Sequence, residues 1–227
     1  MEQHALRRLK MKMALLLPLS FVVLGLFLGL SAGTIWFWQG WLFCAVLFVP
    51  LLFVMSYFLK ASPEFLERRM KYAEKEKEQR WIIAVTNVFF LVGLVLPGLD
   101  YRYGWSSVPV WMILAADVVV LIGYALIFLT FKENAFAGRT VEIFEGQRVI
   151  ETGPYAVVRH PMYAGIIPMF LGMPIALGSF VAIIPLIPVC GLIILRTLNE
   201  EAVLRRDLPG YAAYCTKVRY RLIPSVW

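Results

Sequence analysis

The sequence predicts an all-α integral membrane protein with about six transmembrane helices, the last two forming a short helical hairpin. Hydrophobic residues make up 60% of the 227 positions and charged residues only 16%, against about 25% charged residues in soluble domains. The apolar residues gather in six segments separated by polar connections. The basic residues gather in the connections that would lie on one side of the membrane, which supports the same count of spans.

The first four apolar segments have the length of spanning helices, which need about 20 apolar residues each. In chain order they cover residues 13–33, 41–59, 81–99 and 108–131. The first follows a basic stretch, as a secretory signal does. Its apolar run is longer than the ~7–15 residues of a signal core, so we expect a retained span.

The last two segments, 162–178 and 180–195, form one run of 34 residues without a charge. A single helix over this run would be about 51 Å long at ~1.5 Å per residue, which exceeds an apolar bilayer core of ~30 Å. Gly178 and Ser179 near the midpoint favour a turn. We therefore expect two short helices that form a hairpin.

The charges indicate the topology. With six spans, 21 of the 22 lysine and arginine residues fall on one side of the membrane, and only Arg102 falls on the other. Basic connections stay in the cytoplasm, so both termini and the large polar loops are expected there. A five-span topology would place the basic C-terminal tail outside. The net charge of +7 is thus explained by topology and by attraction to anionic membrane lipids, and no nucleic-acid partner is expected.

The connection 62–80 is expected to form one helix that lies at the cytoplasmic membrane interface. Ser62 is a candidate N-cap and Pro63 suits the first turn, and acidic residues precede basic ones by four positions along the segment. An apolar stripe that includes Phe65 and Leu66 is expected to dip into the lipid headgroups. A solvated connector and a substrate-recruiting element both stay open as its role.

Few polar groups interrupt the spans. Asp117 lies about ten residues into the fourth apolar segment, where an ionised side chain is unfavourable. Pairing with Arg102, contact with a cavity and protonation all stay open for it. The three cysteines and two histidines show no metal-ligand spacing, so we expect no metal site.

The chain divides into a four-span region, 1–131, and a second region, 132–227, that holds the residues typical of chemistry. The stretch 152–165, TGPYAVVRHPMYAG, contains the only histidine beyond the first four residues. Charges return after the apolar hairpin with Arg196, Glu200 and Glu201. If the hairpin turns back, its two polar ends meet at one membrane face and form a site. No glycine-rich nucleotide-binding fingerprint is present, which excludes a Rossmann domain.

This second region resembles a known family of integral-membrane methyltransferases. The resemblance rests on the ordered series Gly153-Pro154-Tyr155, Val158-Arg159-His160-Pro161, Tyr163, Gly165, Arg196, Glu200-Glu201, Leu204, Gly210-Tyr211, Tyr214, Val218-Arg219 and Leu222-Ile223-Pro224. The family includes isoprenylcysteine carboxyl methyltransferases and the related phospholipid N-methyltransferases. The resemblance runs from about Lys132 to the C-terminus, and Pro209 departs from it where the family usually has an aromatic residue.

The resemblance implies S-adenosylmethionine as cofactor. The residues expected to contact it are Tyr155, Arg159, His160, Pro161, Tyr163, Gly165, Glu201 and Leu204. Arg159 would bind the cofactor's carboxylate as a bidentate fork, and Glu201 would accept from its amino group. A tyrosine face would stabilise the sulfonium, and Gly165 would let the cofactor approach the helix closely.

The methyl acceptor is expected to be a lipophilic or prenylated molecule that comes from the bilayer. Arg196, Glu200 and Glu201 are the candidate catalytic residues. Arg196 would hold a carboxylate nucleophile, whereas a glutamate or His160 would deprotonate an amine, so O- and N-methylation both stay open. The candidate substrate contacts are Asn134, Arg139 and Arg206.

Two other classes of function fit parts of the sequence. A sterol-reductase-like, NADPH-dependent membrane enzyme would share the Arg-His-Pro element and an ending like Ala213-Tyr214-Cys215 and Arg221-Leu222-Ile223-Pro224. A membrane scaffold or channel would bind no cofactor at all. The Gly-Pro-Tyr element and the paired glutamates favour methyl transfer.

Overall fold

The computed structural model describes residues 3–70, 77–138, 143 and 146–227, with the backbone alone at 77 and 78. These residues contain eight α-helices, two short 3-10 helices and no strand, which confirms the predicted all-α class. In chain order they are α1 (Gln3–Ala32), α2 (Trp38–Ala61), α3 (Pro63–Arg69), α4 (Lys77–Tyr103), α5 (Val110–Glu133), η1 (Gly153–Ala156), α6 (Pro161–Ala176), η2 (Val181–Ile183), α7 (Leu186–Asp207) and α8 (Tyr211–Lys217).

Five helical stretches within the described residues are long and apolar enough to cross a membrane. They are α1, α2, most of α4, α5, and the combined stretch of η2 and α7, Val181–Asp207. Helix α6 is apolar as well but has only 16 residues. Each of the five continues past the predicted apolar segment, because helical backbone extends through the neighbouring polar residues.

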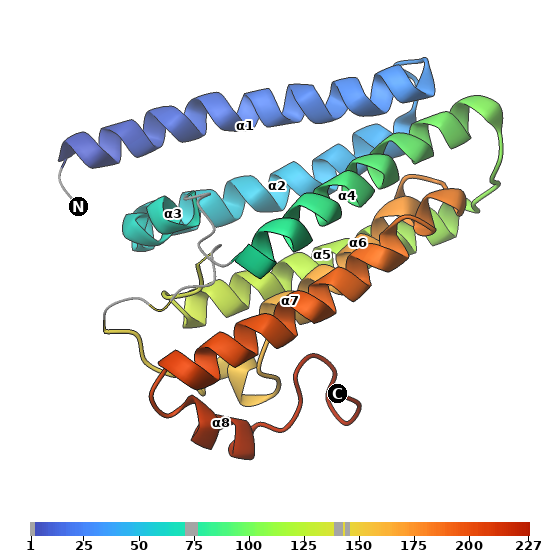
Figure 1. Ribbon diagram of the computed structural model, residues 1–227. Helices are drawn as coiled ribbons and strands as arrows, with labels where there is room; N and C mark the ends of the chain where they lie inside the picture. The colour runs from blue at the N-terminus through green and yellow to red at the C-terminus, as the bar shows by residue number, and fades with distance from the viewer. Residues whose placement is uncertain (1–2, 71–76, 139–142, 144–145) are drawn as a thin grey trace.

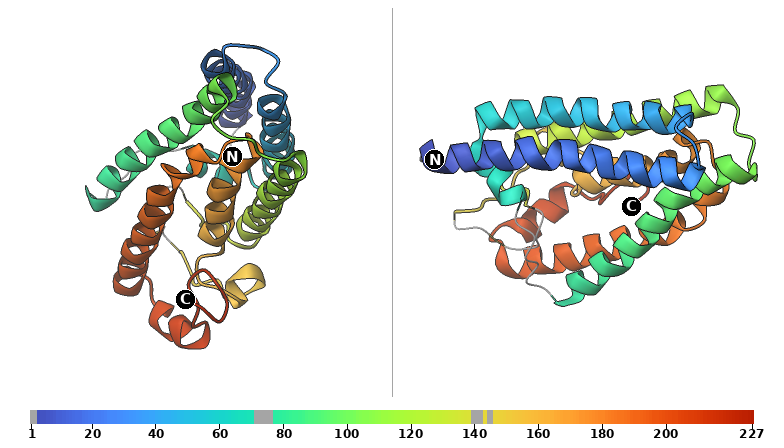
Figure 2. Two further views of the ribbon diagram at one scale, coloured as in Figure 1. Left: turned by 90° about the vertical axis from the view of Figure 1, so that its right-hand side faces the viewer. Right: turned by 90° about the horizontal axis from the view of Figure 1, so that it is seen from above.

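The long helices alternate in direction, so the polar connections gather at one end of the bundle (Figure 1). Helix α3, the described residues 134–138 after α5 and helix α8 all lie at this end. The end-on view in the left panel of Figure 2 shows α6 in the middle, with α5 on one side and α7 on the other.

Glycines allow α5 and α6 to pack closely. A Cβ atom on Gly123 would lie 2.7 Å from the carbonyl oxygen of Gly165, and a Cβ on Gly165 would lie 2.9 Å from the carbonyl oxygen of Gly123. Small residues at a helix–helix contact let the two backbones approach each other. This contact fixes the start of α6, and therefore the residues just before it, relative to the end of α5.

The predicted turn between the last two apolar segments is present. Helix α6 ends at Ala176, and Gly178 has a φ of 77°, a conformation that glycine adopts without strain. The amide of Gly178 donates to the carbonyl of Ile175 at 2.9 Å, and the amide of Ser179 donates to the carbonyl of Pro174 at 2.8 Å. The chain then reverses through η2 into α7.

A buried carboxylate ties this turn to the end of α4. Asp100 is 1% exposed and accepts hydrogen bonds from the backbone amide and the hydroxyl of Ser106, both at 2.6 Å. It also accepts from the hydroxyl of Ser179 in the hairpin turn. The far end of the bundle is thus closed by a polar cluster, since three donors satisfy one carboxylate.

The expected interfacial helix over residues 62–80 lies partly outside the described residues, so its continuity stays a prediction. Helix α3 ends at Arg69 and α4 begins at Lys77, with 71–76 outside the described residues. The Ser62 side chain makes no capping hydrogen bond. Phe65 and Leu66 are only 1% and 6% exposed and pack in a protein cluster with Leu9, Met13, Phe58 and Phe131, so this apolar stripe is buried against neighbouring helices rather than in headgroups.

Asp117 does not pair with Arg102. The Arg102 guanidinium lies over the ring of Tyr103, 5.6 Å from its centroid. Asp117 is 4% exposed, and neither of its carboxylate oxygens has a hydrogen-bond partner within the described part of the chain.

Candidate active site

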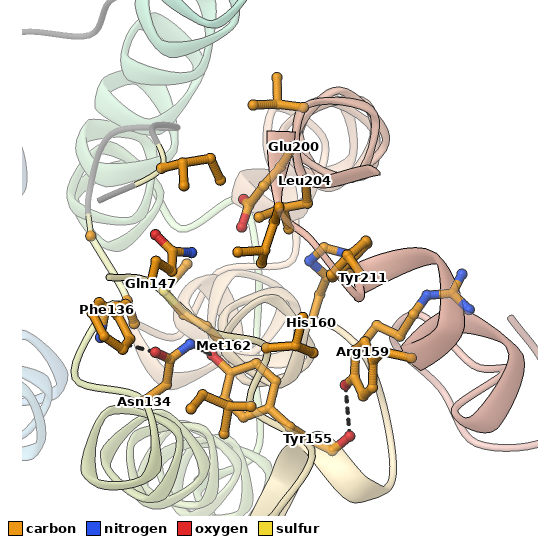
Figure 3. A pocket seen from close by; sticks show the side chains of 18 of the residues that line it. Asn134, Phe136, Gln147, Tyr155, Arg159, His160, Met162, Glu200, Leu204 and Tyr211 are labelled. Carbon is orange, nitrogen blue, oxygen red and sulfur yellow. Dashed lines mark hydrogen bonds between the residues drawn. The ribbon is translucent and has the colours of Figure 1, made fainter. Parts of the chain in front are cut away.

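A pocket lies where α5 ends and α6 begins, at the polar end of the bundle (Figure 3). Its empty volume is about 870 Å³, part of which is open to solvent. Figure 3 shows Glu200 and Leu204 entering it from α7, with Asn134, Phe136 and Gln147 on the opposite wall. His160 and Tyr211 lie beside each other on a third side.

The loop before α6 is held by the C-terminal tail. The amides of Arg159 and His160 donate to the carbonyls of Tyr220 and Arg221, both at 2.9 Å. Pro161 then begins α6, where the missing amide hydrogen is not needed. The tail and the proline together present the His160 ring to the pocket, with its Nε2 3.4 Å from the Tyr211 hydroxyl oxygen.

Glu201 is the centre of a buried ion cluster. Its side chain is 4% exposed, and its Oε1 lies 3.0 Å from Arg159 Nη2 and 2.9 Å from Arg205 Nη2. Its Oε2 lies 2.6 Å from Arg221 Nε. A buried carboxylate requires such partners because desolvation of an unpaired charge is unfavourable. Glu201 therefore joins the loop before α6, helix α7 and the C-terminal tail.

The guanidinium of Arg159 points into the protein. Its Nη1 donates to the carbonyls of Val218 and Arg219, both at 2.9 Å, and its Nη2 pairs with Glu201. These contacts engage both terminal nitrogens, whereas the buried Nε has no hydrogen-bond partner within the described residues. The side chain borders the pocket, and its contact with a cofactor carboxylate stays a prediction.

A second polar chain faces the pocket. The Tyr163 hydroxyl donates to Glu200 Oε2 at 2.6 Å and accepts from Arg196 Nε at 2.9 Å. Arg196 Nη1 donates to Oε1 of Gln79 at 2.9 Å, and Gln79 is 1% exposed. Three helices, α4, α6 and α7, therefore fix the Arg196 guanidinium and the Glu200 carboxylate relative to each other.

Tyr155 is fixed on the opposite wall. Its hydroxyl accepts from the Asn134 amide at 2.9 Å, and its carbonyl accepts from the Tyr214 hydroxyl at 2.7 Å. Burial raises the pKa of Tyr155 to about 12, because the phenolate form would be poorly solvated. The ring is therefore neutral at physiological pH and available as an aromatic face.

The structure brings most of the predicted residues to one pocket. Those that line it are Asn134, Tyr155, Arg159, His160, Pro161, Tyr163, Arg196, Glu200 and Leu204. Glu201 lies behind the pocket, paired with arginines, and is not placed to accept from a cofactor amino group. Gly165 is packed against α5 and not at the pocket. Arg206 pairs with its neighbour Asp207 on the surface, and Arg139 lies outside the described residues.

Other pocket residues were not predicted from the sequence. Gln79, which accepts from Arg196 without lining the pocket, belongs to the polar run 74–80 in the sequence, and nothing in that run indicated this contact. Met162 and Phe136 look like ordinary apolar residues in the sequence, yet both line the pocket. Gln147 and Tyr211 also line it. Tyr211 belongs to the series that carries the family resemblance but was not among the predicted site residues, and Gln147 only lies near that series.

An apolar pocket adjoins the polar one. It lies between α4, α6 and α7 and has an empty volume of about 1050 Å³, part of which is open. Its walls are mostly apolar side chains: Ile82, Ile83, Ile127, Ile166, Met169, Phe170, Leu192 and Ile193. Four residues line both pockets, namely Gly138, Met162, Tyr163 and Arg196. The Tyr163–Arg196 pair thus stands at the junction of a polar and an apolar chamber.

Comparison with known families supports a methyltransferase. Residues 111–208 match the family model described as phospholipid methyltransferase. The match covers α5, α6 and α7 with their connecting loops, and it confirms the resemblance to the integral-membrane methyltransferase group over this region. No curated protein matches the chain.

We predict that Glu201→Gln loosens the C-terminal tail. The amide keeps the volume but removes the charge that Arg159 and Arg221 pair with, and breaking a buried ion pair costs about 3–5 kcal/mol. Thermal unfolding in detergent should show a clear loss of stability, and proteolysis should reach the tail sooner. Glu200→Gln is the matched control, because Glu200 faces the pocket. Equal stability of the two variants would contradict the structural role of Glu201.

We also predict a pH dependence from His160. Burial lowers its pKa below the usual value, and the nearby carboxylates of Glu200 and Glu201 only partly oppose this. A histidine in the unfolded chain protonates near pH ~6.5, so the unfolded state binds the proton first. Stability should therefore fall as the pH drops below about 6.5, with a slope of at most ~1.4 kcal/mol per pH unit.

The melting temperatures of the wild type and His160→Gln, recorded from pH 7.5 to pH 5.5, test this dependence. The wild type should lose more stability over that interval, since the variant lacks the titrating group. Parallel curves would show that His160 is not protonated more easily in the unfolded chain.

Proposed function

We propose that this protein transfers a methyl group from S-adenosylmethionine to a lipophilic acceptor drawn from the bilayer. The observation that carries the proposal is the shared wall between the two pockets, at Met162, Tyr163 and Arg196. The polar pocket suits a nucleoside-like cofactor, and the apolar pocket suits a hydrocarbon tail. The family match over residues 111–208 supports methyl transfer as the chemistry.

The polar pocket has groups that suit a positively charged, polar cofactor. Bound S-adenosylmethionine supplies a methyl group on a positively charged sulfur. The Glu200 carboxylate and the faces of Tyr155 and Tyr211 favour a positive charge in this pocket. The amides of Asn134 and Gln147 offer donors and acceptors for the cofactor's polar edges. Neutral His160, beside Tyr211, offers one further hydrogen-bonding group.

The apolar pocket suits the acceptor. Its mostly apolar walls end at Tyr163 and Arg196, next to the polar pocket, so a bound amphiphile would place its head at the junction. Such a site accelerates the reaction mainly by holding two molecules in line and by excluding water. The lipophilic acceptor and the bilayer lipids are thus the partners that we propose.

Two kinds of nucleophile fit this arrangement. Arg196 would hold a carboxylate at the junction, and no base would be needed for its methylation. An amine would lose a proton, for which Glu200 and neutral His160 are the candidate bases. Glu201 is not among them, because its oxygens are paired with arginines.

We further propose that the chain crosses the membrane six times, with α6 and α7 as the last two spans, and that both termini and the site face the cytoplasm. The alternating direction of the helices supports this topology (Figure 1). The charges support it as well, because Arg102 is alone among the described lysines and arginines at the end opposite the site, and basic residues are retained in the cytoplasm.

Ligand binding distinguishes the proposed function from its alternatives. We expect purified protein to bind S-adenosylhomocysteine saturably in calorimetry and not to bind NADPH. Labelled S-adenosylmethionine, added with a host lipid extract, should label a lipid product whose mass increases by one methylene. Saturable binding of NADPH alone would indicate the reductase, and binding of neither would indicate a scaffold or channel.

Arg196→Ala should remove turnover and leave cofactor binding intact. The variant deletes the guanidinium at the junction, and loss of one such positioned donor lowers kcat by on the order of 100-fold or more. Methyl transfer to the lipid extract and calorimetry with S-adenosylhomocysteine measure the two effects. Arg7→Ala, which removes an exposed arginine near the start of α1, is the control. Full turnover by Arg196→Ala would exclude Arg196 from the mechanism.

A further inference from the structure

The two pockets are separated in part by a short loop, residues 135–138, which we call the wall loop. Phe136, Ala137 and Gly138 line the polar pocket, and Gly138 also lines the apolar pocket. The loop follows the end of α5 and has no helix or strand of its own. Its position therefore depends on what binds its backbone groups.

Two arginines of α3 bind those backbone groups. Arg68 Nη2 donates to the carbonyl of Ala135 at 2.9 Å. Arg69 Nη1 donates to the carbonyl of Gly138 at 2.7 Å and lies 3.4 Å from that of Ala137. The same nitrogen lies 3.8 Å from the sulfur of Met162, which lines both pockets. Three carbonyls of the wall loop thus face guanidinium groups.

The arginines project from a rigid support. Phe65 of α3 is 1% exposed, and its ring centroid lies 4.6 Å from that of Phe58 and 5.4 Å from that of Phe131. The Arg69 guanidinium lies over the Phe131 ring, 4.2 Å from its centroid. A guanidinium that stacks on an aromatic face while it donates to carbonyls is held in one orientation.

The wall loop is fixed on its other side by Asn134. The Asn134 side-chain oxygen accepts from the amide of Phe136 at 2.9 Å, and its amide nitrogen donates to the Tyr155 hydroxyl. The loop is thus held between α3 and a tyrosine of the polar pocket. A shift of the loop would move the walls of both pockets together.

We infer that Arg69 is a positioning residue for methyl transfer, supported by Arg68, which holds the wall between the cofactor and the acceptor. This inference rests on the proposed function. We call Arg68 and Arg69, with their hydrogen bonds to the wall loop, the clamp. Both arginines precede the residues matched by the family model, 111–208, so the clamp belongs to the N-terminal half of this chain. Lysine would replace it poorly, because a compact ammonium cannot stack and donate as the planar fork does.

Two measurements on purified full-length protein test the clamp. Hydrogen exchange of the peptide that covers 133–138, without ligand, should be faster in Arg69→Ala. Calorimetry should show about tenfold weaker binding of S-adenosylhomocysteine, since hydrogen bonds to a charged donor are lost. Arg69→Lys should fall between wild type and alanine, and Arg7→Ala, the exposed arginine control, should match wild type.

The possible results distinguish a failure of the clamp inference from a failure of the proposed methyltransferase function. Unchanged exchange and unchanged affinity in Arg69→Ala would overturn the inference, as would a lower melting temperature with unchanged affinity, which indicates a merely structural arginine. If Arg69→Ala does not fold, Arg68→Ala and Arg69→Lys decide the same question. If wild type binds no S-adenosylhomocysteine, the proposed function fails, while the exchange of 133–138 still tests the clamp.

Discussion

The arrangement of the polar end depends on the buried carboxylate of Glu201. Its side chain is 4% exposed and meets Arg159, Arg205 and Arg221. A charge with so little solvent is stable only when its partners are in place. The loop before α6, the helix α7 and the C-terminal tail must therefore come together as one unit. That unit presents His160 and Tyr211 to the pocket, because the tail that carries Arg221 also binds the amide of His160.

The two adjacent glutamates consequently have different environments. Successive residues of an α-helix point about 100° apart, so Glu200 faces the pocket and Tyr163 while Glu201 faces the arginines behind it. Glu200 is then the carboxylate available to a ligand. Glu201 contacts no pocket ligand itself, but its pairs with Arg159 and Arg221 fix the backbone that carries the ring of His160. The two adjacent acids thus differ in environment: Glu200 lines the pocket, and Glu201 holds the surrounding structure together.

The long apolar helices and the hairpin turn could be predicted from the sequence because a helix in an apolar medium satisfies its own backbone groups, which makes hydropathy decisive. The meeting of His160 with Arg196 and Glu200 followed from the turn at Gly178. The pairing of Glu201 with arginines and the inward contacts of Arg159 could not be predicted in the same way. They depend on the rotation of α7 and on the path of the tail, and neither leaves a periodic signal. The position of α3 likewise depends on the packing of the Phe65 ring against Phe58 and Phe131, which the sequence does not indicate.

The N-terminal half is more than a membrane anchor. Gln79, at the start of α4, fixes the Arg196 guanidinium, and Arg69 of α3 reaches the wall loop. Helix α4 also supplies Ile82 and Ile83 to the apolar pocket. All these residues precede the region that matches the family model. If the apolar pocket holds the acceptor, α4 lines one side of the acceptor's tail, whereas α6 and α7 of the family region supply most of the remaining wall. The polar pocket is built by the family region together with the tail after it. Substitutions at Ile82 and Ile83 should then alter the choice of acceptor more than the binding of the cofactor, because neither residue lines the polar pocket.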